Sequence, residues 1–361
     1  MAAGATTLTA AWRRRGPLAW LLAPFAALYA GVLALRRGAY ATGLARSRRL
    51  PVPVVVIGNL YVGGTGKTPL AIELLHALRA RGWRPGVVSR GYGRTADDVR
   101  IVAAGDSAAD VGDEPLLIAQ AGNAPVAVGA DRVQAAQRLL AAHPECDVII
   151  ADDGLQHLRL ARDVQIAVVD ERGLGNGWVL PAGPLREPAA RLAHVDAIVL
   201  HGAAPQDVPA LARLAAGTPQ FRMRSRLAPQ LESLAQPDRT LALADLVQQQ
   251  RRDAAITVLA AAGIGVPQRF FAMLRAAGLA FDELPLPDHH DFHGDPFAGR
   301  RAIFILITAK DAVKCRRNDA LRSDARIWIA PLVADIDAAL ADLVAARLTS
   351  LGKSPHGPSP A

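Results

Sequence analysis

The segment that decides the fold is residues 54–68, which read VVVIGNLYVGGTGKT. Its first four residues are apolar, as in a buried strand, and its second half is rich in glycine. A helix is expected over residues 69–81, because leucines recur there on one helical face. Strand, glycine-rich loop and helix in this order are typical of phosphate-binding loops. The strict pattern G-x-x-x-x-G-K-[ST] nevertheless requires a glycine where this chain has Tyr61.

A phosphate-binding loop points successive backbone N–H groups at phosphate oxygens, while a lysine bridges the terminal phosphates and a hydroxyl holds Mg²⁺. The residues that would form such a nucleotide site here are Gly63, Gly64, Thr65, Gly66, Lys67 and Thr68. The alternative is a glycine-rich turn whose lysine faces water. Gly58 ends the strand earlier than the strict pattern would place its first glycine, so the loop is extended. We predict that Asn59, inside this extension, faces the cleft.

Further short apolar runs alternate with helix-like stretches at residues 86–89, 125–128, 148–151, 164–169 and 197–200. This alternation predicts an α/β fold with a P-loop NTPase-like parallel sheet covered by helices on both faces. Residues 220–250 lack a clear helix–strand rhythm and are predicted to form a connector, after which a second, smaller α/β unit begins. The expected parts are a membrane-associated helix (1–40), a P-loop domain (41–220), a linker (221–248), a C-terminal α/β domain (249–350) and a disordered tail (351–361).

Residues 17–35 contain no charged side chain, and arginines lie on both sides of them. These nineteen residues are just long enough to span a bilayer as a helix. Pro24 weakens that interpretation, because proline removes a helix hydrogen bond. Arginines at both ends favour a helix that enters the inner leaflet from the cytoplasmic side. A signal peptide fits less well, since basic residues follow the apolar run, and a buried core helix is the remaining alternative.

The composition limits the class of protein. Apolar residues make up 51% of the chain, which excludes a disordered protein, and the net charge of +8 suits an acidic partner such as nucleic acid, anionic lipid or a phosphorylated substrate. Aromatic residues are only 5%, without the basic-aromatic pattern of single-strand binders. Two cysteines, Cys146 and Cys315, do not form a disulfide framework, so the cytosol is the expected compartment.

Two acidic motifs suggest catalysis. Asp152 lies at the end of the apolar run 148–151, where α/β sheets place ligand sites, and Asp153 follows it. A solvated loop pair is the alternative. In the motif GDEP, Asp113 is either the cap of a helix that Pro115 begins or a base for an acceptor hydroxyl, with Glu114 near the metal. The spacing leaves both interpretations open.

Three loops carry basic or histidine side chains. SRGYGR (residues 89–94) combines two glycines with phosphate-type donors, or is a flexible turn with surface arginines. LPAGPLREP (residues 180–188) presents Arg186, a residue type that stabilises a transferring phosphoryl group. PDHHDFH (residues 287–293) lacks the partner motifs of a zinc site. Two interpretations of this segment are left open: it contains a histidine that a carboxylate orients, or it is a plain surface loop.

These motifs occur in one order: GNLYVGGTGKTP, SRGYGR, GDEP, DDGLQH, LPAGPLREP, the turn GIG at residues 263–265, PDHHDF and TAKDAVKC. The ordered set closely resembles the tetraacyldisaccharide 4'-kinases of lipid A biosynthesis, from the N-terminal apolar segment to about residue 345. The resemblance implies transfer of the γ-phosphate of ATP, with Mg²⁺, to the 4'-hydroxyl of a tetraacylated glucosamine disaccharide 1-phosphate, which forms lipid IVA. It also implies two α/β/α domains joined by a two-stranded linker within residues 218–245.

Matching the motifs residue by residue gives expected roles. The catalytic candidates are Asp113, Lys67, Asp153, His289 and Arg186. The metal ligands are Thr68, Asp152 and Glu114. The weaker candidates for substrate or nucleotide contact are Asn59, Arg90, Tyr92 and Gln156. In this scheme Asp113 is the general base, paired with His289 across the cleft. The chain departs from the family pattern at Val266 and Ala309, where relatives often carry asparagine and glutamate.

The resemblance implies a location on the cytoplasmic face of the bacterial inner membrane, either peripheral or anchored by one helix. The expected partners are an anionic glycolipid and the cytoplasmic leaflet, with no nucleic acid and no obligate protein partner. The main rival is a P-loop GTPase or ATPase that acts as a switch or a transport motor. The sequence contains neither an N-K-x-D guanine-reading motif nor an LSGGQ signature. A nucleic-acid-binding ATPase is a second rival, suggested only by the charge.

Overall fold

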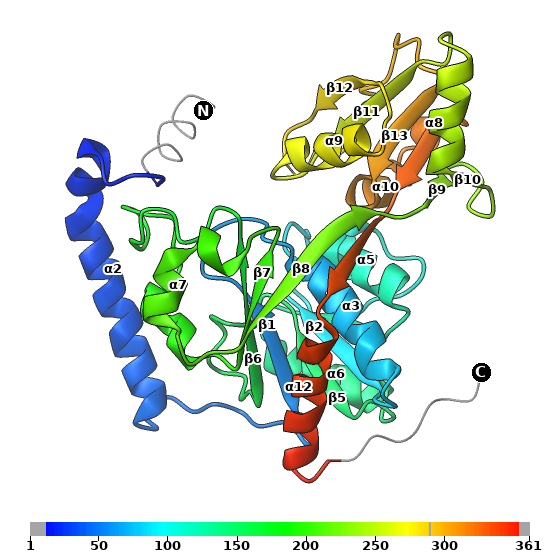
Figure 1. Ribbon diagram of the computed structural model, residues 1–361. Coiled ribbons are helices and arrows are strands. Elements are labelled where there is room, and N and C mark those ends of the chain that lie inside the picture. Colours follow the sequence, from blue (N-terminus) through cyan, green and yellow to red (C-terminus); the bar gives the residue numbers. More distant parts are fainter. Residues whose placement is uncertain (1–11, 289, 354–361) are drawn as a thin grey trace.

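The computed structural model describes residues 12–288 and 290–353 of the 361-residue chain. Two α/β domains and a separate N-terminal helix are visible in Figure 1. The first domain contains a nine-stranded sheet with the order β15-β8-β7-β6-β1-β5-β2-β4-β3. The second contains a six-stranded sheet with the order β10-β9-β14-β13-β11-β12. Both sheets have a parallel centre, which confirms the predicted α/β class.

Strand β1 (Val54–Gly58) lies inside the large sheet, parallel to β5 (Val148–Ala151) and β6 (Val164–Asp170). Its apolar residues alternate between two cores, with Val54 and Val56 on one face of the sheet and Val55 and Ile57 on the other. Because both faces are buried, the strand reads as a continuous apolar run. The other strands of this sheet are β2 (Pro85–Ser89), β3 (Arg100–Ile101), β4 (Val126–Val128), β7 (Ala197–His201), β8 (Gln220–Leu227) and β15 (Leu332–Ile336).

Helices cover both faces of the large sheet. Helix α3 (Lys67–Arg79) buries the four leucines that the sequence placed on one helical face, and they pack with Val55 and Ile57. Helix α6 (Arg132–Ala142) packs into the core on the opposite face. The remaining helical segments of this domain are α4 (Ala108–Val111), α5 (Asp113–Gly122), α7 (Pro209–Leu214), α12 (Ala338–Ser350) and the 3₁₀ turns Ala189–His194 and Pro205–Asp207.

The second domain repeats this plan on a smaller scale. Its parallel strands are flanked by an apolar core on each face, one centred on Phe270 and Phe271 and the other on Phe292 and Phe297. Its strands are β9 (Gln230–Ser233), β10 (Thr240–Ala242), β11 (Val258–Ala262), β12 (Asp282–Pro285), β13 (Phe304–Thr308) and β14 (Ile327–Ala330). Its helices are α8 (Leu243–Arg252), α9 (Pro267–Ala276), α10 (Ala309–Cys315) and α11 (Asp319–Arg322).

The expected connector at residues 220–250 differs from the structure. Strand β8 begins there and lies in the large sheet between β7 and β15, and β9, β10 and α8 already belong to the second domain. In β8, buried Phe221 and Met223 alternate with exposed Arg222 and Arg224. This alternation leaves no continuous apolar run, so the strand was not apparent from the sequence.

The expected C-terminal boundary is also wrong. Strand β15 returns to the large sheet and pairs antiparallel with β8, so the two strands form the connection between the domains (Figure 1). Helix α12 then packs beside α3 through Leu340, Val344 and Leu348. Residues 332–350 therefore belong to the first domain and not to the C-terminal one. The chain crosses between the domains twice, which fixes the second domain at two points.

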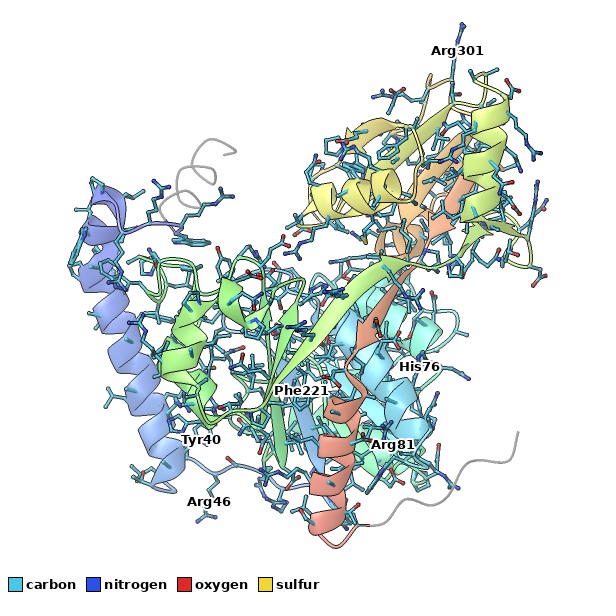
Figure 2. All side chains as sticks on the ribbon, in the orientation of Figure 1. Tyr40, Arg46, His76, Arg81, Phe221 and Arg301 are labelled. Atoms are coloured by element: carbon cyan, nitrogen blue, oxygen red, sulfur yellow. The ribbon has the colours of Figure 1, made fainter. Side chains whose placement is uncertain are left out.

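Helix α2 (Pro17–Ala41) runs unbroken through Pro24 and stands along one side of the first domain (Figure 1). Figure 2 shows Tyr40 and Arg46 at its C-terminal end, where the chain turns toward β1. Within the described part of the chain it is the one helix long and apolar enough to cross a membrane. Only 11% of its most apolar window is buried, which excludes the alternative of a core helix. The exposed large apolar residues of α2 are Trp20, Leu21, Phe25, Leu28, Val32 and Leu35.

Helix α2 is also fixed to the first domain by specific contacts. Ala26 is buried in the core, and the rings of Trp20 and Trp178 meet edge to face. The Tyr29 hydroxyl donates to the backbone oxygen of Arg186 at 3.1 Å. Arg37 forms an ion pair with the buried carboxylate of Glu187, also at 3.1 Å. The helix thus touches the loop that carries the predicted phosphate-binding arginine.

Candidate active site

The glycine-rich loop connects β1 directly to α3. Gly63 and Gly66 have φ angles of 96° and 95°, a conformation that side chains with a Cβ rarely adopt. A Cβ on Gly66 would also collide with the ring of His201. Helix α3 begins at Lys67, directly after this turn, so the free N–H groups of its first turn open toward the loop. The local geometry is that of an anion-binding loop.

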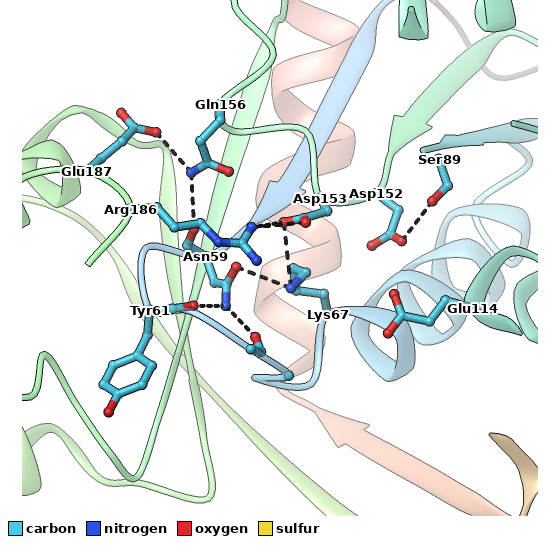
Figure 3. A network of polar contacts seen from close by, with 12 residues as sticks. Asn59, Tyr61, Lys67, Ser89, Glu114, Asp152, Asp153, Gln156, Arg186 and Glu187 are labelled. Carbon is cyan, nitrogen blue, oxygen red and sulfur yellow. Dashed lines mark hydrogen bonds and ion pairs between the residues drawn. The ribbon is translucent and has the colours of Figure 1, made fainter. Parts of the chain in front are cut away.

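Three predicted catalytic residues meet at this loop (Figure 3). The Lys67 ammonium lies 3.6 Å from Asp153 Oδ1. Arg186 donates from Nη1 to both oxygens of Asp153, at 3.0 Å each. Asp153 therefore holds a lysine and an arginine side by side next to the phosphate loop. Two cations in this position can neutralise charge on a transferring phosphoryl group.

Asn59 supports the loop from inside. Its side chain is fully buried, so the prediction that it faces the cleft is wrong. Its amide nitrogen donates to the backbone oxygens of Tyr61 and Gly63, at 2.6 and 3.1 Å, and its oxygen accepts from Lys67 at 3.2 Å. An extended loop has carbonyl groups that need donors, and Asn59 supplies them. Its place is to shape the loop and orient Lys67.

Gln156 belongs to the same scaffold. Its Nε2 group donates to the backbone oxygen of Asn59 at 3.2 Å and to Glu187 Oε1 at 2.9 Å (Figure 3). Arg90 and Tyr92, the other weak candidates, follow β2 at the same end of the sheet and are exposed. The structure thus ties Asn59 and Gln156 into the loop support and leaves the two others accessible.

The two neighbouring aspartates differ in their electrostatics. Burial, with the nearby Glu114 carboxylate, raises the pKa of Asp152 to about 7, although Lys67 acts in the opposite direction. Its Oδ1 atom has no hydrogen-bond partner among residues 12–288 and 290–353, and Oδ2 accepts from Ser89 at 3.4 Å. Burial also disfavours charge on Asp153, but Lys67 and Arg186 outweigh it and lower the pKa of Asp153. A buried carboxylate without a cation partner is typical of a functional site.

The predicted base, Asp113, receives two lysines from the second domain. Its carboxylate lies 3.6 Å from the Lys310 ammonium and 3.4 Å from that of Lys314, both on α10. Lys310 is also 3.3 Å from Glu114. Burial tends to lower the pKa of Lys310, but the carboxylates of Glu114 and Asp113 raise it overall. Asp113 is the first residue of α5 and follows the N-cap Gly112, so the simple capping alternative is wrong.

His289, the proposed partner of Asp113, lies outside the described residues. Of the two departures from the family pattern, Val266 is the N-cap of α9 and makes no side-chain cap. Ala309 opens α10, where Thr308 accepts from the Asp311 N–H and supplies the cap instead. The neighbouring turn is held by Asp311, which accepts from the Gly263 N–H at 3.0 Å. These second-domain motifs are organised without the two missing side chains.

A cavity of about 630 Å³ lies between the domains. The loop residues Lys67 and Thr68 line it from the first domain, and Arg269 and Lys310 line it from the second. This volume falls in the range of small-molecule and cofactor pockets. The cavity therefore places a ligand against the phosphate loop and the Asp113 region together.

Sequence reasoning missed His201, at the end of β7. Its Nδ1 atom is 2.8 Å from the backbone oxygen of Thr65, and its Nε2 atom is 2.8 Å from the Ser225 hydroxyl on β8. Burial lowers its pKa, which favours the neutral ring. A carbonyl only accepts, so Nδ1 carries the proton and Nε2 accepts from Ser225. The available signal in the sequence was that His201 is a polar residue at the end of an apolar strand. Its partners, Thr65 and Ser225, could not be identified because they are distant in sequence.

His157, in the motif DDGLQH, gives the fold a pH dependence. Burial and the nearby Arg132 lower its pKa from 6.5 to about 4. The unfolded chain binds this proton more readily, so stability is lost as pH falls from about 6.5 toward 4, by about 1.4 kcal/mol per pH unit for one such group. We expect the Tm of the unaltered protein to fall faster over this window than that of His157→Gln. Asp152 titrates in both proteins and cancels from the comparison. Parallel Tm–pH curves would contradict the assignment.

Comparisons with known proteins agree on one family. The family model described as tetraacyldisaccharide-1-P 4'-kinase matches residues 18–349. A tetraacyldisaccharide 4'-kinase of Janthinobacterium sp. (strain Marseille) is 53% identical over 342 residues, covering 94% of this chain and 95% of the relative. One from Herminiimonas arsenicoxydans is 52% identical over 345 residues, covering 93% and 94%.

Among solved structures, LpxK from Aquifex aeolicus in complex with ATP is similar, with a TM-score of 0.72 and 29% identity. The match covers 92% of this chain and 99% of that one. These similarities favour the kinase interpretation over the alternative of a switch or transport motor. By its family match and by the identity of its full-length relatives, the chain belongs to the tetraacyldisaccharide 4'-kinase family.

Proposed function

We propose that this protein transfers the γ-phosphate of ATP to the 4'-hydroxyl of tetraacyldisaccharide 1-phosphate, which forms lipid IVA. The observation that carries the proposal is the joint placement of Lys67, Asp153 and Arg186 at a phosphate loop. Lys67 lines one cavity together with Glu114, the neighbour of Asp113. Phosphoryl transfer depends mainly on positioning and charge stabilisation, and this arrangement supplies both. The names of the relatives and the ATP complex of the Aquifex protein support the same reaction.

The residues present fit a Mg²⁺ ion. Asp152 has a buried oxygen without a partner among the described residues, and the Thr68 hydroxyl and Glu114 carboxylate line the same region. Oxygen ligands suit Mg²⁺, which usually retains waters and binds few protein groups. When bound, the ion supplies charge neutralisation for the phosphates; Asp152, Thr68 and Glu114 would hold it.

Each residue of the proposed active site then has a role in the reaction. Lys67 binds the terminal phosphates, and Arg186 stabilises the negative charge of the transferring group. Asp153 orients both cations. Asp113 accepts the proton of the acceptor hydroxyl as the new P–O bond forms, and the leaving ADP keeps the electrons of the broken bond. Lys310 and Lys314 hold the Asp113 carboxylate in place from the second domain.

We place the protein on the cytoplasmic face of the inner membrane, with α2 lying in the interface. Contacts of α2 with the first domain extend from Trp20 to Arg37, most of its length. A spanning position would therefore carry part of the first domain into the hydrocarbon. The exposed apolar face of α2, the flanking arginines and the net charge of +8 suit an anionic leaflet that holds the glycolipid acceptor.

A direct test is incubation of the purified protein with γ-labelled ATP, Mg²⁺ and the disaccharide 1-phosphate lipid. We expect the label to appear on the lipid at its 4' position. ATP hydrolysis without a labelled lipid would instead favour the switch or motor, and ATP-dependent binding to DNA would favour the nucleic-acid ATPase.

The double substitution Leu28→Asp and Leu35→Asp tests membrane contact. Both side chains are exposed on the outer face of α2, by 69% and 77%. Burial of one leucine is worth about 1.5–3 kcal/mol, so we expect vesicle binding to weaken by at least about tenfold. Sedimentation with anionic vesicles measures this, and activity on detergent-dispersed acceptor should be retained. Ile303→Asp, at an exposed site of the second domain, is the matched control. Equal sedimentation of all three proteins would contradict the placement.

A further inference from the structure

Asp170, at the end of β6, is a buried carboxylate that the mechanism above does not use. Strand β6 is the direct neighbour of β1, so its end lies beside the phosphate loop. The Asp170 side chain is fully buried. Burial alone would raise its pKa, but hydrogen bonds and charge from Arg172 and Arg269 lower it overall. An ionised buried carboxylate of this kind organises the cations around it.

Arg172 carries this organisation to the phosphate loop. Its Nη2 atom is 2.7 Å from Asp170 Oδ2 and also 2.7 Å from the backbone oxygen of Gly64, to which it donates. Its guanidinium lies over the ring of Tyr61, with 4.3 Å between Cζ and the ring centre. Such a cation–π contact is favourable, most of all where water is excluded. Arg172 therefore holds the loop at two points, one before and one after its first tight turn.

Arg269 reaches the same carboxylate from the second domain. It lies on α9, and its Nη2 atom is 3.1 Å from Asp170 Oδ2. Its Nε atom donates to Glu171 Oε1 at 2.9 Å. Oδ2 of Asp170 is thus shared between an arginine that grips the loop and an arginine that comes from the other domain. We call Arg269, Asp170 and Arg172 the arginine relay.

The shared atoms make the two arginines interdependent. Without Arg269, half of the positive charge around Asp170 Oδ2 is lost, and that oxygen attracts Arg172 Nη2 more strongly. The same Nη2 atom is the donor to Gly64, so its pull toward Asp170 weakens the hold on the loop carbonyl. A contact made by the second domain is in this way transmitted to the backbone that binds phosphate.

We propose that Arg269 is a positioning residue for nucleotide binding, acting through Asp170 and Arg172 on Gly64 and Tyr61. The inference rests on the proposed function, because it takes the loop to be the ATP site. The inference also explains why this chain has a tyrosine at position 61, where the strict phosphate-loop pattern has its first glycine. The Tyr61 ring is the surface on which Arg172 packs. The loop then has its phosphate-binding geometry when the second domain supplies Arg269.

Direct contact of Arg269 with the nucleotide is the alternative, since this side chain also lines the cavity. The two roles predict different effects of a double substitution on nucleotide affinity. Two residues that act through one relay lose the same interaction, so their effects on affinity do not add. Two residues that contact the nucleotide separately give effects that multiply.

The experiment measures ATP·Mg²⁺ affinity by calorimetry with the full chain and the variants Arg269→Gln, Arg172→Gln and both together. We expect each single change to weaken binding about tenfold, and the double change to weaken it no more than about twofold further. Arg275→Gln, on the same helix and 54% exposed, is the matched control and should bind as the unaltered protein does. A double variant weakened about a hundredfold would overturn the relay and indicate direct contact.

Hydrogen exchange in the nucleotide-free protein separates this inference from the proposed function. Peptides covering residues 59–70 should exchange faster in Arg269→Gln than in the control, while peptides of β4 and α6 remain unchanged. Arg269→Lys, which keeps the charge, should recover part of the protection. Identical exchange of the loop in Arg269→Gln and the control would overturn the relay. Failure of the unaltered protein to bind ATP would overturn the proposed function and leave this exchange test valid.

Discussion

Replacement of Lys67 by alanine is expected to lower kcat/KM for phosphate transfer by about 10³-fold, or roughly 4 kcal/mol of transition-state stabilisation. Lys67 is the buried cation closest to the loop, and it is held between Asn59 and Asp153 at 3.2 and 3.6 Å. Its loss removes the charge that the terminal phosphates meet. It also leaves the buried oxygen of Asn59 without its donor.

The assay is label transfer to the lipid under saturating Mg²⁺, and thermal unfolding is followed in parallel. Lys353→Ala serves as the control, because that lysine is exposed and donates only to the backbone oxygen of Pro51 among the described contacts. We expect the control to retain full activity. If kcat/KM of a folded Lys67→Ala protein fell by less than tenfold, Lys67 would not contact the transferred phosphate.

Asp113→Asn carries the second large expected effect, a reduction of kcat by about 10²–10³-fold. The amide has nearly the same shape as the carboxylate but accepts no proton from the acceptor hydroxyl. KM for ATP should change little, because the loop and its cations are untouched.

Lys314→Met distinguishes base catalysis from a structural ion pair. This substitution removes one of the two ammonium groups at Asp113 and leaves Lys310 in place. If Asp113 acted only by joining the domains, Lys314→Met would reproduce the loss of kcat. We expect kcat to change by less than about tenfold, since the carboxylate remains.

The sequence predicted most of the first domain because its central strands are buried on both faces. The apolar run 148–151 is the strand β5, and β1 extends the expected run by a single residue. The same periodicity identified the leucine face of α3. The loop, Asp152 and Asp153 were recognisable because parallel sheets place ligand-binding residues at the ends of such strands. Periodicity and strand ends are local features of the chain, so they can be recognised in a single sequence.

Other parts of the site depend on contacts between distant segments. Asp170 and Arg269 lie 99 residues apart, and no local pattern joins them. The lysines that hold Asp113 come from α10, and the first of them, Lys310, lies 196 residues beyond Glu114. Burial was equally hard to foresee: Asn59 belongs to a loop, where exposure is usual, yet its side chain is enclosed by the backbone it supports. The place of strand β15 in the first domain was hidden because its partner, β8, is distant in sequence.

The contacts of α2 have a consequence for any soluble form of this enzyme. The helix donates from Tyr29 to the backbone of Arg186 and balances buried Glu187 with Arg37, so truncation at residue 41 would also remove part of the catalytic scaffold. A shortened protein with low activity would not by itself measure the need for a membrane. Substitutions on the outer face keep these contacts and are the better route to soluble material.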